Sequence, residues 1–208
     1  MLTVVHEMHN TSTGELSATA IDGYEPSSVS AKILRSRFKN VLSPMPDEAS
    51  PRGISTSPTG SRAALDGLLA AGAEICFRGT VLPRHVCSDG RADDGFALSV
   101  FTDAVPHVWQ KTPMTHAYMS ERNLGRVAVE MKLTWVSPLK SGDMFVIVSA
   151  PTSVNSKTMN IRHHLYESQT KRLSAICDVV ALVMDLETRK SVALPEEAAK
   201  RIPRLILD

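Results

Sequence analysis

The sequence predicts an α+β fold in which an antiparallel sheet wraps around one long central helix. Three observations predict it. Residues 126–136 alternate apolar and polar side chains with the period of a β-strand. Three more strand-like segments follow, each bounded by turn-forming residues. A strand-like segment, residues 74–82, and a long apolar helix, residues 96–110, precede them. A helix covered by a sheet is a stable layer arrangement, so these elements fit one domain.

The four consecutive strands are expected to form an antiparallel meander. The first, residues 126–136, has one apolar face: Val127, Val129, Met131, Leu133 and Trp135. The second, residues 144–150, is expected to end at Pro151. The third and fourth cover residues 157–167 and 173–184, and Met159, Ile161, His163 and Leu165 share one face of the third. Short turns between strands favour pairing of sequence neighbours.

The helix of residues 96–110 is apolar over most of its circumference, which predicts that it is buried. Asp93 or Asp94 is placed to cap its first N–H groups. Pro106 removes one backbone hydrogen bond and is expected to kink the last turn.

The first 73 residues are organised differently. Residues 1–25 are predicted to form a β-hairpin, and residues 26–73 a helix (27–41), a linker rich in Ser, Pro and Gly (42–62) and a short helix (63–73). The sheet-and-helix domain is then residues 74–208. The hairpin shares His, Thr, Leu, Ser and Ala at matched positions with residues 163–175. Either two hairpins with similar turns have converged, or residues 1–25 are a remnant of a first copy of the domain.

The composition excludes several classes of protein. A net charge of +1 gives no reason to expect nucleic acid or a membrane as a partner. No apolar run approaches the roughly 20 residues of a membrane span, and the first ten residues do not resemble a signal peptide. Three widely spaced cysteines predict neither disulfides nor a metal site. The expectation is a reduced, cytoplasmic protein.

A polar loop, residues 84–95, lies directly before the helix. It carries His85, Gly90, Arg91, Asp93 and Asp94. Free N–H groups at a helix N-terminus attract negative charge, so the place suits an oxyanion or a phosphate. The same composition is also typical of an ordinary capped loop.

A polar stripe of Ser99, Asp103 and His107 follows one face of the apolar helix. A carboxylate there would suit a general base that activates water. The alternative is that this face lies at a subunit interface or at an exposed end of the helix. His163 and His164 are adjacent on a strand, so they point to opposite faces and cannot share one metal ion. The motifs of zinc proteases, nucleotide hydrolases and serine hydrolases are absent.

Several short sequence segments resemble those of the thioesterase hot-dog superfamily, in particular its 4-hydroxybenzoyl-CoA thioesterase-like branch. They are Arg-Gly-Thr-Val-Leu-Pro at 78–83, Phe-x-Asp-Ala at 101–104, Leu-Thr-Trp-Val-Ser-Pro-Leu at 133–139 followed by Gly-Asp at 142–143, and an ending at 185–195. The resemblance covers residues 74–200. It implies a hot-dog fold, hydrolysis of an acyl-CoA thioester without a cofactor other than the CoA of the substrate, and active sites that form between two hot-dog units. A homodimer or a larger homo-oligomer is therefore expected.

The resemblance is weakest at the active site. The branch has an Asp, then Gly-His, then Asn in the loop. Here Gly90 matches the glycine, but Arg91 stands at the histidine, Asp93 at the asparagine, and Cys87 or His85 at the catalytic Asp. A second branch, resembling phenylacetate-pathway thioesterases, uses a backbone N–H after a Gly pair and an acid within the helix.

The polar loop, the polar stripe and these resemblances together give two sets of candidate residues. The catalytic candidates are Asp94, Asp103, Asp93 and His85, with Asp94 or Asp103 as the base. The substrate-binding candidates are Gly90, Arg91, Gly95 and Ser99, with the Gly95 N–H as oxyanion donor.

Three functions remain open at this point. The leading hypothesis is hydrolysis of an acyl-CoA by water that a carboxylate activates. The second is binding of an acyl thioester without catalysis. The third is a hot-dog dehydratase acting on acyl thioesters, with His85 and Asp94 as its acid–base pair. The sequence does not determine the acyl group.

Overall fold

The structure is a computed structural model that describes residues 2–24, 27–55, 59 and 63–206. The backbone divides into a unit of residues 1–52 and a unit of residues 53–208. The second unit begins at Gly53, whereas the sequence placed the start of the sheet-and-helix domain at residue 74. The reason is that the segment before β3 packs on the sheet. Residues 56–58 and 60–62 of the predicted linker lie outside the described residues.

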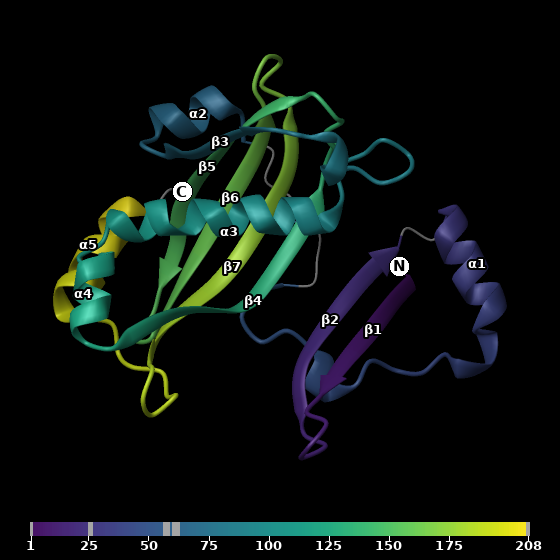
Figure 1. Cartoon of the computed structure of the whole chain (residues 1–208), viewed down its shortest axis with the longest axis horizontal. Helices are drawn as coiled ribbons and strands as arrows, with labels where there is room; N and C mark the ends of the chain where they lie inside the picture. Colours follow the sequence, from purple (N-terminus) through teal and green to yellow (C-terminus); the bar gives the residue numbers. More distant parts are fainter. Residues whose placement is uncertain (1, 25–26, 56–58, 60–62, 207–208) are drawn as a thin grey trace. The chain divides into compact units, whose positions relative to one another are not determined.

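The second unit contains the predicted antiparallel sheet and the predicted long helix. The sheet has the strand order β3-β5-β6-β7-β4. Its strands are β3 (Glu74–Thr80), β4 (Leu124–Trp135), β5 (Met144–Val154), β6 (Thr158–Glu167) and β7 (Leu173–Asp185). Helix α3 (Asp94–Gln110) lies across one face of this sheet, as Figure 1 shows. The predicted α+β class is confirmed.

The predicted meander is correct for β5, β6 and β7 and wrong for β4. β4 pairs with β7 at the far edge of the sheet instead of with β5, which follows it in sequence. Residues 136–143 connect β4 to β5, which is a longer connection than a tight hairpin turn. A longer connection does not force its two strands to pair.

Helix α3 is buried on one face only, which corrects the prediction of a fully buried helix. Phe96, Val100, Phe101 and Trp109 pack into the core. The opposite face is exposed: Leu98, Ser99, Thr102, Asp103 and His107 lie on it. The sheet of one chain covers only one side of the helix. The sequence offered Asp93 or Asp94 as the N-cap, and Asp93 is the N-cap. The helix continues through Pro106 to Gln110.

The strands match the predicted alternation in part, and register shifts interrupt it in several of them. In β6, Met159, Ile161, His163 and Leu165 are all buried, as predicted for one face. In β4, a register shift between Ala128 and Glu130 interrupts the alternation. Val129 lies at this shift and is 51% exposed, and Met131 is 39% exposed, although the sequence predicted both to be buried. β5 continues past Pro151 to Val154 because a second bulge accommodates the proline.

Residues 53–55 and 63–73 pack on the outer face of the sheet, opposite α3. The backbone N–H groups of Gly53 and Ile54 donate to the Glu130 carboxylate, at 2.8 and 2.9 Å from Oε2. The Tyr166 hydroxyl donates to the Ala63 carbonyl at 2.6 Å. Helix α2 (Leu65–Ala70) adds Leu65 to a second apolar cluster with residues of β5 and β6. These described residues therefore belong to the domain and pack against its sheet.

Two short helices were not anticipated from the sequence. Helix α4 (His116–Glu121) leads from α3 into β4 and buries Met119. Helix α5 (Glu196–Arg201) follows β7 and buries Ala198, and Ile202 continues that contact with the core. Within the described residues, no helix has the length and apolarity to span a bilayer.

The first unit contains the predicted hairpin and helix. Strands β1 (Leu2–His9) and β2 (Leu16–Tyr24) pair antiparallel around a turn in which Gly14 has φ 73°. Helix α1 (Val29–Arg37) begins after Ser28, whose hydroxyl accepts from the Ala31 N–H. That this hairpin is a remnant of a first hot-dog unit stays a prediction.

Candidate functional site

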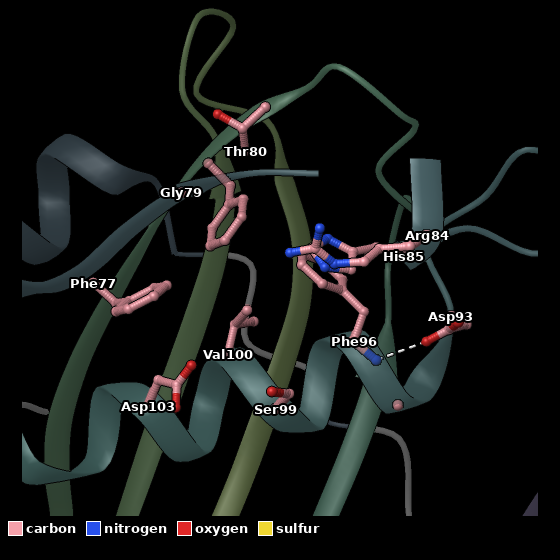
Figure 2. Close-up of a pocket in the computed structure, with 12 residues that line it drawn as sticks. Phe77, Gly79, Thr80, Arg84, His85, Asp93, Phe96, Ser99, Val100 and Asp103 are labelled. Carbon is pink, nitrogen blue, oxygen red and sulfur yellow. Dashed lines mark hydrogen bonds between the residues drawn. The ribbon is translucent and has the colours of Figure 1, made fainter. Parts of the chain in front are cut away.

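A cavity of about 490 Å³ opens where the first half of α3 faces β3 and β5. Figure 2 shows side chains from these elements and from the η3 turn (Pro83–His85) converging on it. Five of the eight residues that the sequence singled out as site candidates line this cavity: His85, Asp93, Gly95, Ser99 and Asp103. The first of these five residues in the sequence is His85 and the last is Asp103. The fold thus brings together residues that are up to 18 positions apart in the sequence.

Aromatic rings form one wall of the cavity. Phe145 of β5 lies 6.1 Å from Phe77 and 5.5 Å from Phe96, measured between ring centroids. Gly79 allows this packing, because a Cβ at that position would stand 2.6 Å from Phe145 Cζ. The wall is therefore apolar and tightly packed. The sequence analysis missed it, because its three rings come from three different elements.

His85 presents a hydrogen-bond donor at this cavity. The Leu82 N–H donates to His85 Nδ1 at 3.1 Å. A ring nitrogen that accepts a hydrogen bond carries no proton, so the neutral imidazole holds its proton on Nε2. The ring stacks on Phe96 with the centroids 4.7 Å apart, which limits its rotation. The Nε2–H is therefore the group that His85 can offer to a bound ligand.

The N-terminus of α3 supplies a second donor. Asp93 Oδ1 accepts from the Phe96 N–H at 2.6 Å, and the Asp93 N–H donates to the His85 carbonyl at 3.1 Å. These two bonds join the η3 turn to the start of the helix. Gly95 lies within the first turn, where backbone N–H groups have no acceptor inside the helix. Its N–H and the positive end of the helix dipole favour a negative charge in the cavity.

Asp103 and Ser99 occupy successive turns of α3, and both line the cavity, as Figure 2 shows. The sequence predicted that these two residues share a face of the helix with His107. His107 lies one turn further on and is exposed, outside the residues that line the cavity. Asp103 accepts no hydrogen bond from the described residues, so its carboxylate is available to water or to a ligand.

Three sequence candidates lie elsewhere. Asp94 Oδ1 accepts a hydrogen bond from Trp135 Nε1 at 2.6 Å, and Asp94 does not line the cavity. Gly90 has φ 80° in the turn of the preceding loop. Arg91 pairs with Asp89 at 3.6 Å on the surface of that loop. The structure therefore brings His85 together with Asp93 and Asp103, and it does not bring His85 together with Asp94.

His163 and His164 are buried away from this cavity and point to opposite faces of the sheet, as predicted. His163 contacts Phe101 of α3, with the ring centroids 5.7 Å apart, and its Nδ1 lies 2.6 Å from the Ser149 hydroxyl. Burial is the main cause that lowers the pKa of His163 to about 3. His164 stacks on Tyr166 of the outer face, and burial lowers its pKa to about 4. Both imidazoles are thus neutral parts of the core.

Known proteins similar to this chain were found by family and by structure. A model of the thioesterase-like superfamily matches residues 84–202. The probable thioesterase YbaW from Escherichia coli has 17% identity and a TM-score of 0.55, over 64% of this chain and 99% of that protein. The 1,4-dihydroxy-2-naphthoyl-CoA thioesterase from Synechocystis has 14% identity and a TM-score of 0.54, over 63% and 96%.

A third similar structure is a hypothetical protein from Staphylococcus aureus in complex with CoA. It has 18% identity and a TM-score of 0.57, over 64% of this chain and 84% of that protein. Identities this low show the fold alone, and this is the hot-dog fold that the resemblance implied. No curated protein sequence matches the chain.

Proposed function

Because the chain belongs to the thioesterase-like superfamily, we propose that it hydrolyses an acyl-CoA thioester in the cavity at the start of α3. One observation carries the proposal. The carboxylate of Asp103, which has no hydrogen-bond or ion-pair partner among the described residues, lines the same cavity as the donors of His85 and Gly95. The CoA complex of the similar Staphylococcus aureus protein supports CoA as the carrier.

The proposed reaction needs only water as a co-reactant. Asp103 takes a proton from a water molecule, and the oxygen of that water attacks the thioester carbonyl carbon. The His85 Nε2–H and the Gly95 N–H donate to the carbonyl oxygen as it becomes an oxyanion. The C–S bond then breaks, the carbonyl re-forms, and the CoA thiolate takes the proton held by Asp103. The products are the free acid and CoA, so no further cofactor is required.

Asp103 is a better candidate for the base than the other two carboxylates. Asp94 is bonded to Trp135 and lies outside the cavity lining. Asp93 lines the cavity, but one of its oxygens caps the helix through the Phe96 N–H. Asp103 lines the cavity, and no described residue donates a hydrogen bond to its carboxylate. Its oxygens can therefore accept a proton from water.

The test is hydrolysis of a panel of acyl-CoAs, followed by the release of the CoA thiol. Asp103→Asn should lower kcat by about 10²- to 10⁴-fold, because an amide cannot accept the proton. Asp94→Asn is the matched control: its amide oxygen still accepts from Trp135, so kcat should stay close to that of the native protein. A large loss in Asp94→Asn together with full activity in Asp103→Asn would assign the base to Asp94 instead.

The same panel separates the three functions that the sequence left open. Tight binding of acyl-CoAs without turnover of any chain length would favour a binding protein. Hydration of crotonyl-CoA that exceeds thioester hydrolysis would favour a dehydratase. Turnover that is unchanged in both variants would remove the assignment of Asp103 and leave the thioesterase activity standing.

A second copy of the chain is part of the proposal. The resemblance implies that hot-dog sites form between two units, and the face of α3 that carries Asp103 and Leu98 is exposed in the single chain. We expect a dimer or tetramer in solution in which a second copy covers this face. Light scattering coupled to size-exclusion chromatography measures the mass, and a fully active monomer would contradict this part.

A further inference from the structure

Arg84 places a cation in the cavity that the proposed reaction does not use. It belongs to the η3 turn and lines the cavity next to His85. Figure 2 shows its guanidinium group extending from this turn into the cavity. The sequence analysis did not single it out, because an arginine in a polar loop carries no signal by itself.

Some arginines of this chain pair with a carboxylate, and Arg84 does not do so within the described residues. Arg162 pairs with Asp178 at 2.7 Å, and Arg91 pairs with Asp89 at 3.6 Å. Among the residues that the structure describes, Arg84 has no ion pair and no hydrogen bond, although Asp93 and Asp103 line the same cavity. Its planar group of five N–H donors is suited to a carboxylate or phosphate that approaches with two oxygens. A ligand is therefore free to bind it.

The position of Arg84 decides between two sources of the anion. Arg84 is adjacent in sequence to His85, whose Nε2–H is the proposed donor to the thioester carbonyl. Both side chains line one cavity, so an anion bound to Arg84 would share that cavity with the reacting carbonyl. In an acyl-CoA, the whole pantetheine arm separates the diphosphate from the sulfur atom. A carboxylate at the far end of a short acyl group is instead only a few bonds away.

Resting on the proposed thioesterase activity, we propose that the cavity takes the monothioester of a short dicarboxylic acid and that Arg84 binds its free carboxylate. The carboxylates of Asp93 and Asp103 would repel such an acyl group if Arg84 were absent. Arg84 thus makes the cavity selective for charge, while the wall that includes Phe77, Phe96 and Phe145 contacts the methylene groups.

The test compares succinyl-CoA with butyryl-CoA, which have four-carbon acyl groups with and without the carboxylate. The native protein should have the higher kcat/KM for succinyl-CoA. Arg84→Gln should lower that value by about 10- to 100-fold, the usual effect of losing hydrogen bonds to a charged group. It should change butyryl-CoA hydrolysis by less than about threefold. Arg122→Gln is the matched control, since Arg122 lies at the end of α4 and does not line the cavity, and it should change the hydrolysis of neither substrate.

The N-acetylcysteamine thioesters of the same two acids lack all phosphates and separate the two sources. A loss in Arg84→Gln that persists with the succinyl form of this carrier supports the acyl carboxylate. A loss that disappears with it would assign Arg84 to the phosphates of CoA and overturn the proposal. Equal losses for succinyl and butyryl groups would overturn it as well, since Arg84 would then act on the thioester itself.

Binding keeps this inference testable if no thioester is hydrolysed. Thioether analogues in which a methylene replaces the carbonyl, S-(3-carboxypropyl)-CoA and S-butyl-CoA, cannot react. Calorimetry should show that the native protein binds the carboxylated analogue at least about tenfold more tightly, and that Arg84→Gln removes the difference. Equal affinities in the native protein would refute the carboxylate site, whatever the outcome of the hydrolysis assay.

Discussion

Acidification from about pH 7.5 to about pH 5 should destabilise the folded chain through His163 and His164, by about 2 kcal/mol for each imidazole. His163 has no exposed surface, and His164 is 6% exposed. The Nε2 atoms of both rings lack a hydrogen-bond partner among the described residues. Protonation of either ring would place a charge in the core, where the Asp178 carboxylate offsets only part of the loss of hydration.

The sign of the effect comes from the depressed pKa values. The ordinary pKa of 6.5 falls to about 3 for His163 and to about 4 for His164 in the folded chain. The unfolded chain therefore binds more protons than the folded chain below pH 6.5, so stability falls as the pH falls. Well above that pH the imidazoles are neutral in both the folded and the unfolded chain. The two histidines then contribute no pH dependence to stability.

The magnitude comes from the same pKa difference. Each pH unit between the unfolded and folded pKa values costs about 1.4 kcal/mol for one proton. Between pH 6.5 and pH 5 this amounts to about 2 kcal/mol for His163 and nearly as much for His164. For a domain of ordinary stability this loss is large.

Urea unfolding at several pH values and constant ionic strength measures the effect, with tryptophan fluorescence as the probe. Trp109 is fully buried and should report unfolding. His163→Gln keeps a polar group that can bond Ser149 but removes the titration, so its stability should fall by about 2 kcal/mol less than that of the native protein over this range. His107→Gln, at an exposed position of α3, should follow the native curve. An identical pH slope for the native protein and His163→Gln would refute the reasoning.

Further predictions concern glycines and cysteines. Gly79→Ala should destabilise the chain by about 1–3 kcal/mol, because its Cβ would stand 2.6 Å from Phe145 Cζ in the aromatic wall. Gly67→Ala, in α2 with nothing within 4 Å of its Cβ, should stabilise it by about 0.5–1 kcal/mol; urea midpoints measure both, and equal midpoints for the two variants would contradict the packing argument. A thiol reagent should label exposed Cys87 quickly in the native protein. Cys177 should react only on unfolding, because it is buried and burial raises its pKa to about 12, and peptide mapping of native labelled protein checks this.

Most elements of the second unit could be predicted from the sequence, because their patterns depend on near neighbours. The period of two in β6 placed Met159 to Leu165 on one face, and the structure buries that face. The acidic pair before the helix predicted a cap, and Asp93 is the cap. These signals arise within a few residues of one another, where backbone geometry sets which side chains share a face.

The pairing of β4 and the exposure of α3 were decided only by the tertiary structure. The alternation in β4 says that one face meets a core, but not which strand lies beside it. The apolar circumference of α3 likewise predicts that other elements cover the helix. It does not indicate that the sheet of this chain covers only one of its faces. Pairing and coverage depend on contacts between residues far apart in the chain, which local periodicity does not carry.

The candidate site divides in the same way. The sequence by itself determined that polar groups gather around the start of the helix, and five of its eight candidates line one cavity. Only the fold distinguished Asp103, which faces that cavity, from Asp94, which is bonded to Trp135. Only the fold placed Arg84 at the cavity that the aromatic wall lines. The direction of a side chain depends on the packing of several elements at once, and for that reason one sequence pattern could name the candidates but could not choose among them.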